Sequence, residues 1–161
     1  MTSTGGGDVH DWGPLVVDAA QVSRRLKMPG VSDLLPAPAI GHAKTVSVVG
    51  SAGPETVPAT IVRWALGLRS TWFEVGVLSL TRPAGTIQPG ATVTLTGVAR
   101  RVPVVALEQR TGTGAWEAGP AIQPAADGTF SVDVQPAGTT QYRLVADGVQ
   151  SLPLRVPVAG S

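Results

Sequence analysis

The feature that most constrains the fold is the regular alternation of apolar and polar residues in short segments between turn residues. Thr129–Val134 is the clearest case, because Phe130, Val132 and Val134 all fall on one side of an extended chain. The turn residues Ala126–Gly128 stand directly before it. A segment of this kind forms a strand with one buried and one exposed face, so the chain has to build sheets that cover a core.

The same alternation recurs along the second half of the sequence. From about Thr81 onward only strand signals are present, and turn signals separate them at short intervals. Strands of this length and spacing favour an antiparallel sandwich over residues 81–161. Tyr142, near the start of the penultimate strand, is placed like the tyrosine corner of Ig-like sandwiches. We expect strands at Ala91–Val98, Val102–Gln109, Ala115–Gly119, Thr129–Val134, Thr140–Ala146 and Ser151–Val158.

Composition supports a β-rich chain and excludes several classes of site. Aromatic residues make up 4% and charged residues 14% of the sequence, while 20 Gly and 14 Pro supply many turns. The formal net charge is +1 with scattered Lys and Arg, which gives no basic stripe for nucleic acid. The absence of Cys excludes disulfides, thiolate metal ligands and cysteine nucleophiles. No apolar run is long enough to span a membrane.

The first half mixes helix and strand signals. Trp12–Val17 reads as a strand, followed by a helix that Asp18 caps and Pro29-Gly30 ends. Thr45–Val49 reads as the first strand of a hairpin that turns at Gly50–Gly53 and returns from Glu55.

A second helix is predicted to begin at Pro58 and to stop at Gly67, with a further strand at Thr71–Val77. We place the domain boundary at Arg82–Gly85 and expect a flexible N-terminus over residues 1–8. The expected fold class is therefore mainly β: a small α+β fragment over residues 9–80, followed by an antiparallel Ig-like β-sandwich.

Three pieces of the first half resemble the SpoIID/LytB family, the stage II sporulation protein D and amidase-enhancer family. Arg63–Phe73 is close to the family's "R-x-x-L-G-L-[KR]-S-T-x-F" ending and is the most specific piece. Asp11-Trp12 with Val16–Leu26 is similar to its entry strand and short helix, and Thr45–Val57 to its Gly-turn hairpin. The second half is similar to the Ig-like modules that follow this domain in many actinobacterial members.

The resemblance implies a parent protein that remodels peptidoglycan as a lytic transglycosylase or amidase enhancer. Glycan cleavage needs a carboxylic acid that protonates the leaving oxygen. The family carries this glutamate in an earlier "G-E-[ML]-P" segment, for which this sequence has no counterpart. We therefore expect no catalytic residue, metal or cofactor in this chain, and an upstream coding segment would be needed to supply the acid. The resemblance also implies an extracellular or wall-associated location, although the sequence has no signal peptide.

Arg69, Ser70, Thr71 and Trp72 are the candidates for a glycan groove. A guanidinium beside two hydroxyls can bind sugar hydroxyls or a lactyl carboxylate, and an indole can stack on a sugar ring. The structural alternative is a helix end in which Arg69 binds free carbonyls, Ser70 shapes the turn and Trp72 packs into the core. Phe73 is expected in the core.

Other candidate residues have ordinary structural explanations. Glu55 and Glu74 fit solvated strand faces, and His10 and His42, with Asp8 and Asp11, lack a metal-binding spacing. We expect Trp64 at a seam of the fold and Trp116 in the sandwich core or at its edge. Asp127-Gly128 and Asp147-Gly148 fit β-turns better than calcium loops.

Three functional hypotheses remain open at this point. The first is a non-catalytic part of a SpoIID/LytB-like protein that acts on peptidoglycan glycan strands. The second is an adhesion module that binds the cell wall or a wall-associated protein through its sandwich. The third is a fragment whose first half buries too little surface to fold well.

Overall fold

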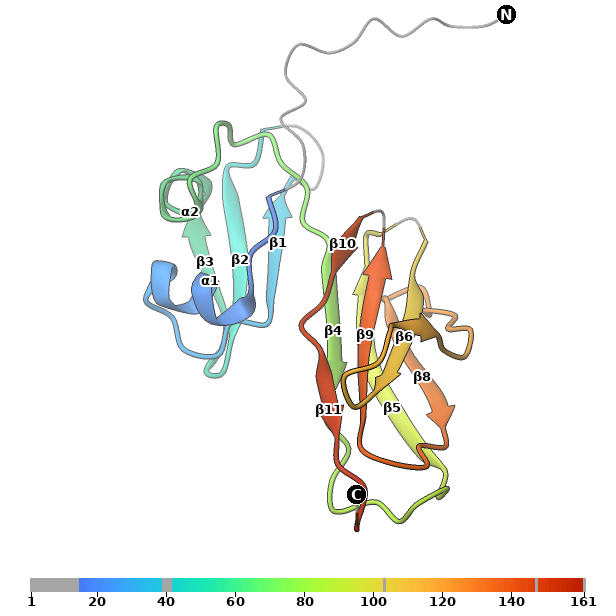
Figure 1. Ribbon diagram of the computed structural model, residues 1–161. Coiled ribbons are helices and arrows are strands. Elements are labelled where there is room, and N and C mark those ends of the chain that lie inside the picture. The colour runs from blue at the N-terminus through green and yellow to red at the C-terminus, as the bar shows by residue number, and fades with distance from the viewer. Residues whose placement is uncertain (1–14, 39–41, 103, 147, 161) are drawn as a thin grey trace, which may run out of the picture. The chain divides into compact units, whose positions relative to one another are not determined.

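The computed structural model describes residues 15–38, 42–102, 104–146 and 148–160, and it is mainly β. The chain divides into two compact units, Met1–Glu74 and Val75–Ser161, called unit 1 and unit 2 (Figure 1). Within the described residues, neither helix has the length and apolar character that crossing a bilayer requires.

Unit 1 is a three-stranded antiparallel sheet with two short helices. The strands lie in the order β1-β2-β3; α2 packs on β2 and β3, and α1 packs on α2. The core comes from alternate strand positions, with Val46, Val48 and the helical Val62 completely buried. The elements in chain order are α1 (Ala19–Leu26), β1 (Asp33–Ala37), β2 (Thr45–Gly50), β3 (Gly53–Pro58) and α2 (Ala59–Leu66).

Local capping chemistry fixes both helices of unit 1. The carboxylate of Asp18 accepts a hydrogen bond from the backbone N–H of Gln21 at 2.6 Å, which confirms it as the N-cap of α1. α2 follows Pro58 and ends at Gly67, whose φ of 72° is the left-handed conformation that glycine adopts without strain. The predicted hairpin is also present, with Gly50 paired to Gly53 across a two-residue loop.

Three parts of unit 1 differ from the sequence-based expectations. β1 was not predicted; it pairs with β2 at the sheet edge, where Pro36 is tolerated. Residues 15–17 do not form the expected strand, and Trp12 lies outside the described residues. The predicted strand at Thr71–Val77 is wrong for most of its length. Trp72 forms one bridge with His42, and only the last residue, Val77, belongs to a strand, β4 (Val77–Thr81).

Unit 2 consists of two antiparallel sheets that enclose one core. One sheet has the order β4-β5-β8; the other has β10-β9-β6-β7, and β11 also pairs with β9. The chain passes from one sheet to the other after β5, β7 and β8, which gives an Ig-like sandwich. The strands are β4 (Val77–Thr81), β5 (Val93–Arg100), β6 (Ala106–Thr111), β7 (Glu117–Ala118), β8 (Thr129–Val134), β9 (Thr140–Ala146), β10 (Val149–Gln150) and β11 (Leu154–Val156).

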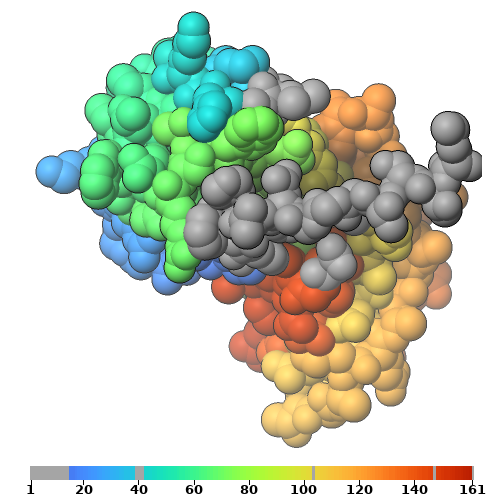
Figure 2. Space-filling model, turned by 90° about the horizontal axis from the view of Figure 1, so that it is seen from above, coloured from blue at the N-terminus to red at the C-terminus, as the bar shows by residue number. Residues whose placement is uncertain are grey.

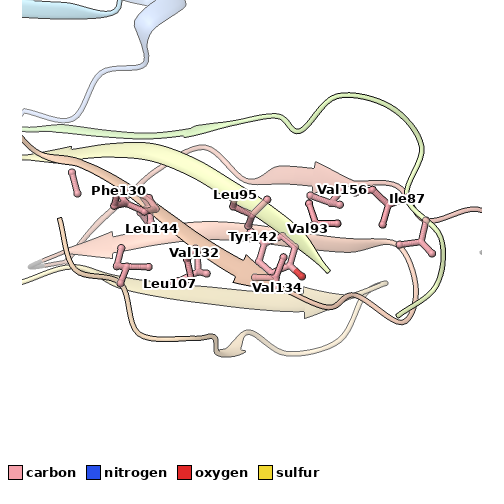
Figure 3. Close-up of a cluster of buried hydrophobic side chains, with 13 residues drawn as sticks. Ile87, Val93, Leu95, Leu107, Phe130, Val132, Val134, Tyr142, Leu144 and Val156 are labelled. Atoms are coloured by element: carbon pink, nitrogen blue, oxygen red, sulfur yellow. The ribbon is translucent and has the colours of Figure 1, made fainter. Parts of the chain in front are cut away.

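The core of unit 2 lies between the inner faces of these sheets, as Figure 3 shows. Leu95 and Phe130 belong to one sheet, and Leu107, Tyr142 and Leu144 to the other. Tyr142 is 1% exposed; burial raises the pKa of its phenol, and a hydrogen bond with the Thr140 side chain opposes that rise.

Each strand predicted in the second half is present, but several bounds differ. β6 begins at Ala106 and not at Val102, β7 is limited to Glu117–Ala118, and β11 is limited to Leu154–Val156. The short β10 and most of β4 were not predicted as strands. β8 and β9 coincide with the predicted segments, whereas β5 begins two residues later than expected, at Val93. The units divide between Glu74 and Val75, ahead of the expected boundary at Arg82–Gly85, because β4 pairs with β5 along its whole length.

The end of the chain covers β9 in two short pieces. β10 pairs with Val145 and Ala146, and β11 pairs with residues 140–142. Between them, Ser151 forms two hydrogen bonds with the backbone of Leu144. The Ser151 hydroxyl accepts a hydrogen bond from Leu144 N–H at 2.9 Å, and Ser151 N–H donates one to Leu144 C=O at 2.9 Å. The backbone of β9 is thus hydrogen-bonded at Leu144, where β10 has ended and β11 has not yet begun.

Candidate functional site

The segment after α2 presents the side chain of Trp72 to solvent. Trp72 is 63% exposed, so it does not pack into the core as the structural alternative required. Its backbone is held by the bridge to His42 and by the hydrogen bond from Ala43 N–H to Thr71 C=O at 2.9 Å. Residues from this part of unit 1 are at the molecular surface, in green in Figure 2.

His42 contacts the exposed indole directly. The two ring centroids are 5.1 Å apart and the ring planes are inclined by 67°, an edge-to-face arrangement. The imidazole Nδ1 of His42 also lies 3.2 Å from the hydroxyl of Thr71. A histidine on a separate segment therefore packs against the Trp72 ring.

The hydroxyls of Ser70 and Thr71 contact the backbone of Trp72 and the ring of His42, respectively. Ser70 Oγ accepts a hydrogen bond from Trp72 N–H at 3.0 Å, a local turn closed by a side chain. A hydroxyl has one donor and two acceptor positions, so both residues keep hydrogen-bonding capacity for a ligand. Ser70 therefore shapes the turn as expected, and Trp72 is nevertheless exposed.

Arg69 is exposed and has an interaction within the protein. The carbonyls at the end of α2 are bound by other arginines: Arg63 Nε donates to Leu68 C=O at 3.2 Å, and Arg25 Nη1 donates to Leu66 C=O at 3.4 Å. Arginine capping of this helix end therefore occurs, and Arg63 and Arg25 provide it.

Trp64 and Trp116 differ in how much of the ring is exposed and in how many arginines contact it. Trp64 is 76% exposed on α2, with the Arg63 guanidinium 5.1 Å from its ring centroid, so it does not lie at a seam. Trp116 is half-buried, with Arg110 at 4.6 Å and Arg143 at 4.1 Å from its ring centroid. Trp116 is therefore engaged within unit 2 and is a poor stacking surface for a sugar.

The remaining sequence candidates do not form a catalytic or metal site in the described part of the chain. Glu55 lies exposed on β3, and Glu74 is exposed at the end of unit 1. No group of three or more His, Cys, Asp or Glu able to hold a metal occurs among the described residues. Asp8, His10, Asp11 and Asp147 lie outside them.

Asp127 closes a β-turn, as the sequence indicated. Its Oδ1 accepts hydrogen bonds from the N–H of Thr129 at 2.9 Å and from the Thr129 hydroxyl at 2.7 Å. These bonds hold the pKa of the carboxyl below its ordinary value.

The geometry around Trp72 suits ligand binding. An exposed indole in contact with an imidazole, in a segment that carries two hydroxyls, can stack on a sugar ring and exchange hydrogen bonds with its hydroxyls. Phe73 is half-buried next to it. Sequence reasoning identified Arg69–Trp72 but missed His42, because nothing in the sequence links positions so far apart.

Comparison of the sequence with protein-family models and with curated proteins gives no match.

Proposed function

We propose that this chain is a non-catalytic, glycan-binding part of a SpoIID/LytB-like protein that remodels peptidoglycan. The observation that carries the proposal is the exposed, oriented ring of Trp72 within the segment that resembles the family's ending. A solvent-exposed indole that packs against an imidazole is a suitable surface for a sugar ring.

In the proposed complex, Trp72 stacks on one sugar of a glycan strand. Ser70 and Thr71 lie next to it and exchange hydrogen bonds with the sugar hydroxyls. Arg69 supplies positive charge for the lactyl carboxylate of a muramyl residue, at the exposed end of the same segment. The imidazole of His42 keeps the indole from rotating, which lowers the entropy cost of binding.

Catalysis is assigned to the parent protein and not to this chain. Glycoside hydrolysis uses a protonated carboxylic acid, kept in that state by a buried or otherwise perturbed environment. Glu55 and Glu74, the carboxylates closest in sequence to the family-like pieces, are both exposed. The proposed location is extracellular or cell-wall associated, in keeping with the substrate.

The proposal is tested with the full chain and insoluble peptidoglycan in a sedimentation assay. The expected result is binding by the wild type and a reduction of about tenfold in Trp72→Ala, the scale expected for loss of one stacked ring. Trp64→Ala is the matched control, since Trp64 is also exposed but lies on α2. Equal binding by the wild type and Trp72→Ala, or release of anhydro-muropeptides by the chain alone, would contradict the proposal.

A second candidate is an adhesion module that binds a wall-associated protein through the sandwich. The observation in its favour is Val104 of unit 2, which is 76% exposed beside a surface hollow. In the same assay, retention that Trp72→Ala leaves intact and Val104→Asp removes would favour this candidate.

A further inference from the structure

Unit 2 has a surface hollow of about 540 Å³ that is separate from the Trp72 site. Its walls are the end of β5, the described residues 101, 102, 104 and 105 that follow it, and the segment that leads into β8. A hollow of this volume falls in the range of sites for small molecules and short peptide segments.

The hollow is lined by polar and apolar groups together, and its apolar part consists of valines, Ile122 and smaller residues. Val102 and Val105 are half-buried, Ile122 is 9% exposed, and Val104 projects into solvent at the rim with 76% of its surface exposed. An exposed valine next to Val102, Val105 and Ile122 is a surface that a small apolar group can cover. No aromatic side chain lines the hollow, so it offers no stacking surface for a sugar.

Two arginines bring positive charge to the same hollow. Arg100 is engaged within the protein, whereas Arg101 is exposed and takes part in no hydrogen bond or ion pair among the described residues. The backbone φ of Arg101 is 54°, a left-handed conformation that is unfavourable for a residue with a long side chain. Such strain tends to be retained where a side chain has a binding role.

The main chain around the hollow has room for a peptide ligand. Val104 and Gln123 take part in no backbone hydrogen bond among the described residues, and both are exposed. The amide side chain of Gln123 lines the hollow as well. A ligand with peptide groups can therefore pair with this backbone while its side chains contact the valines.

From these observations we propose that the hollow binds the C-terminal end of a short peptide with alanine-sized side chains. Arg101 binds the terminal carboxylate, Val104 and Ile122 contact the methyl groups, and Val104 and Gln123 pair with the peptide backbone. This site is a second one in the chain, and it does not depend on glycan binding at Trp72.

The test is a titration of the full, isotope-labelled chain with N-acetyl-Ala-Ala, followed by amide NMR shifts. Saturable shifts are expected around Arg101, Val104 and Gln123, and the C-terminal amide of the same peptide should bind at least about tenfold more weakly, since it lacks the charge. Butyrate tests whether a simple carboxylic acid is enough, and it is expected to bind more weakly than the peptide.

Variants separate the charge from the backbone strain. Arg101→Gln and Arg101→Gly should both reduce affinity by about tenfold, although glycine relieves the strained φ. Arg101→Lys should retain part of the binding, and Arg155→Gln, an exposed arginine of β11 outside the hollow, should bind like the wild type. Absence of saturable shifts, equal binding of acid and amide, or unchanged binding in Arg101→Gln would overturn the proposal. Butyrate binding as tightly as the peptide would overturn its peptide specificity.

Discussion

The imidazole of His42 meets the indole of Trp72 edge to face, with ring centroids 5.1 Å apart, although the two residues belong to different segments of unit 1. The contact is reinforced by the 3.2 Å approach of His42 Nδ1 to the Thr71 hydroxyl. An exposed tryptophan thus has a partner that favours one orientation of its ring, and such pre-organisation favours a stacking site.

His42→Ala should loosen the Trp72 ring without unfolding unit 1, because the His42 side chain is exposed. We expect peptidoglycan retention to fall by a few-fold, less than in Trp72→Ala, since the indole itself remains. Sedimentation measures retention, and the line widths of the Trp72 indole N–H in NMR spectra report its mobility. Full retention on peptidoglycan together with a mobile indole would show that binding does not depend on the contact between His42 and Trp72.

Trp116→Ala should destabilise unit 2. The centroid of the indole lies 4.6 Å from the Arg110 guanidinium and 4.1 Å from that of Arg143, and Arg143 is in turn bound to Glu108 by an ion pair of 2.7 Å. Loss of two cation–π contacts and their packing should cost about 1–3 kcal/mol. Hydrogen exchange of the β6 and β9 amides in the full chain measures this cost.

Trp64→Ala is the control for Trp116→Ala, because Trp64 is 76% exposed and contacts one arginine in unit 1. It should leave exchange in β6 and β9 unchanged. If Trp116→Ala also leaves it unchanged, the arginine–tryptophan stack contributes nothing to the stability of unit 2.

Gly97→Ala should be among the most damaging single changes in unit 2. A Cβ at this central β5 position would stand 2.7 Å from Cζ of Phe130 and would collide with the carbonyl oxygen of Ser79. Relief requires movement of the core ring and of the paired β4 backbone, which should cost about 1–3 kcal/mol or more. Thr96→Ala, an exposed neighbour, is the control in urea unfolding; equal midpoints would show that β5 accommodates the methyl group.

Asp127 should make the stability of unit 2 depend on pH in the acid range. Hydrogen bonds from Thr129 lower the pKa of Asp127 in the folded protein below its ordinary value of 3.8. The stabilisation is therefore present above pH 3.8 and is lost as the pH falls through the lower, folded pKa. Thermal unfolding from pH 6 to pH 2.5 should show the difference between wild type and Asp127→Asn narrowing as the pH falls. A difference that stays constant would mean that the carboxylate charge plays no part.

The elements that the sequence predicted well are those whose determinants are local. Asp18 caps α1 through a bond to a residue three positions away, and Gly67 ends α2 through its own backbone conformation. β8 coincides with its prediction because alternation and the Asp127-Gly128 turn give the same boundaries. The site residues Arg69–Trp72 were found for a similar reason, since they follow a clear helix stop.

The parts that failed depend on partners distant in sequence. β1 contains Pro36, which argues against a strand unless its edge position is known. Thr71–Val77 has the composition of a strand, but Ser70 binds the backbone of Trp72, and a ladder begins only at Val77, the first residue of β4. His42 could not be placed at the site because its contact with Trp72 arises only from folding.

The break between β10 and β11 at Ser151 has a consequence for how copies of the molecule meet. An unbroken final strand would present one straight row of free amide and carbonyl groups, to which a second molecule can add its own strand. Here the outer edge consists of a two-residue piece and a three-residue piece, with Leu144 and Ser151 already paired at the join. A neighbouring chain therefore has no long row of unpaired backbone groups to pair with on this side, and we expect this edge to resist the addition of a strand.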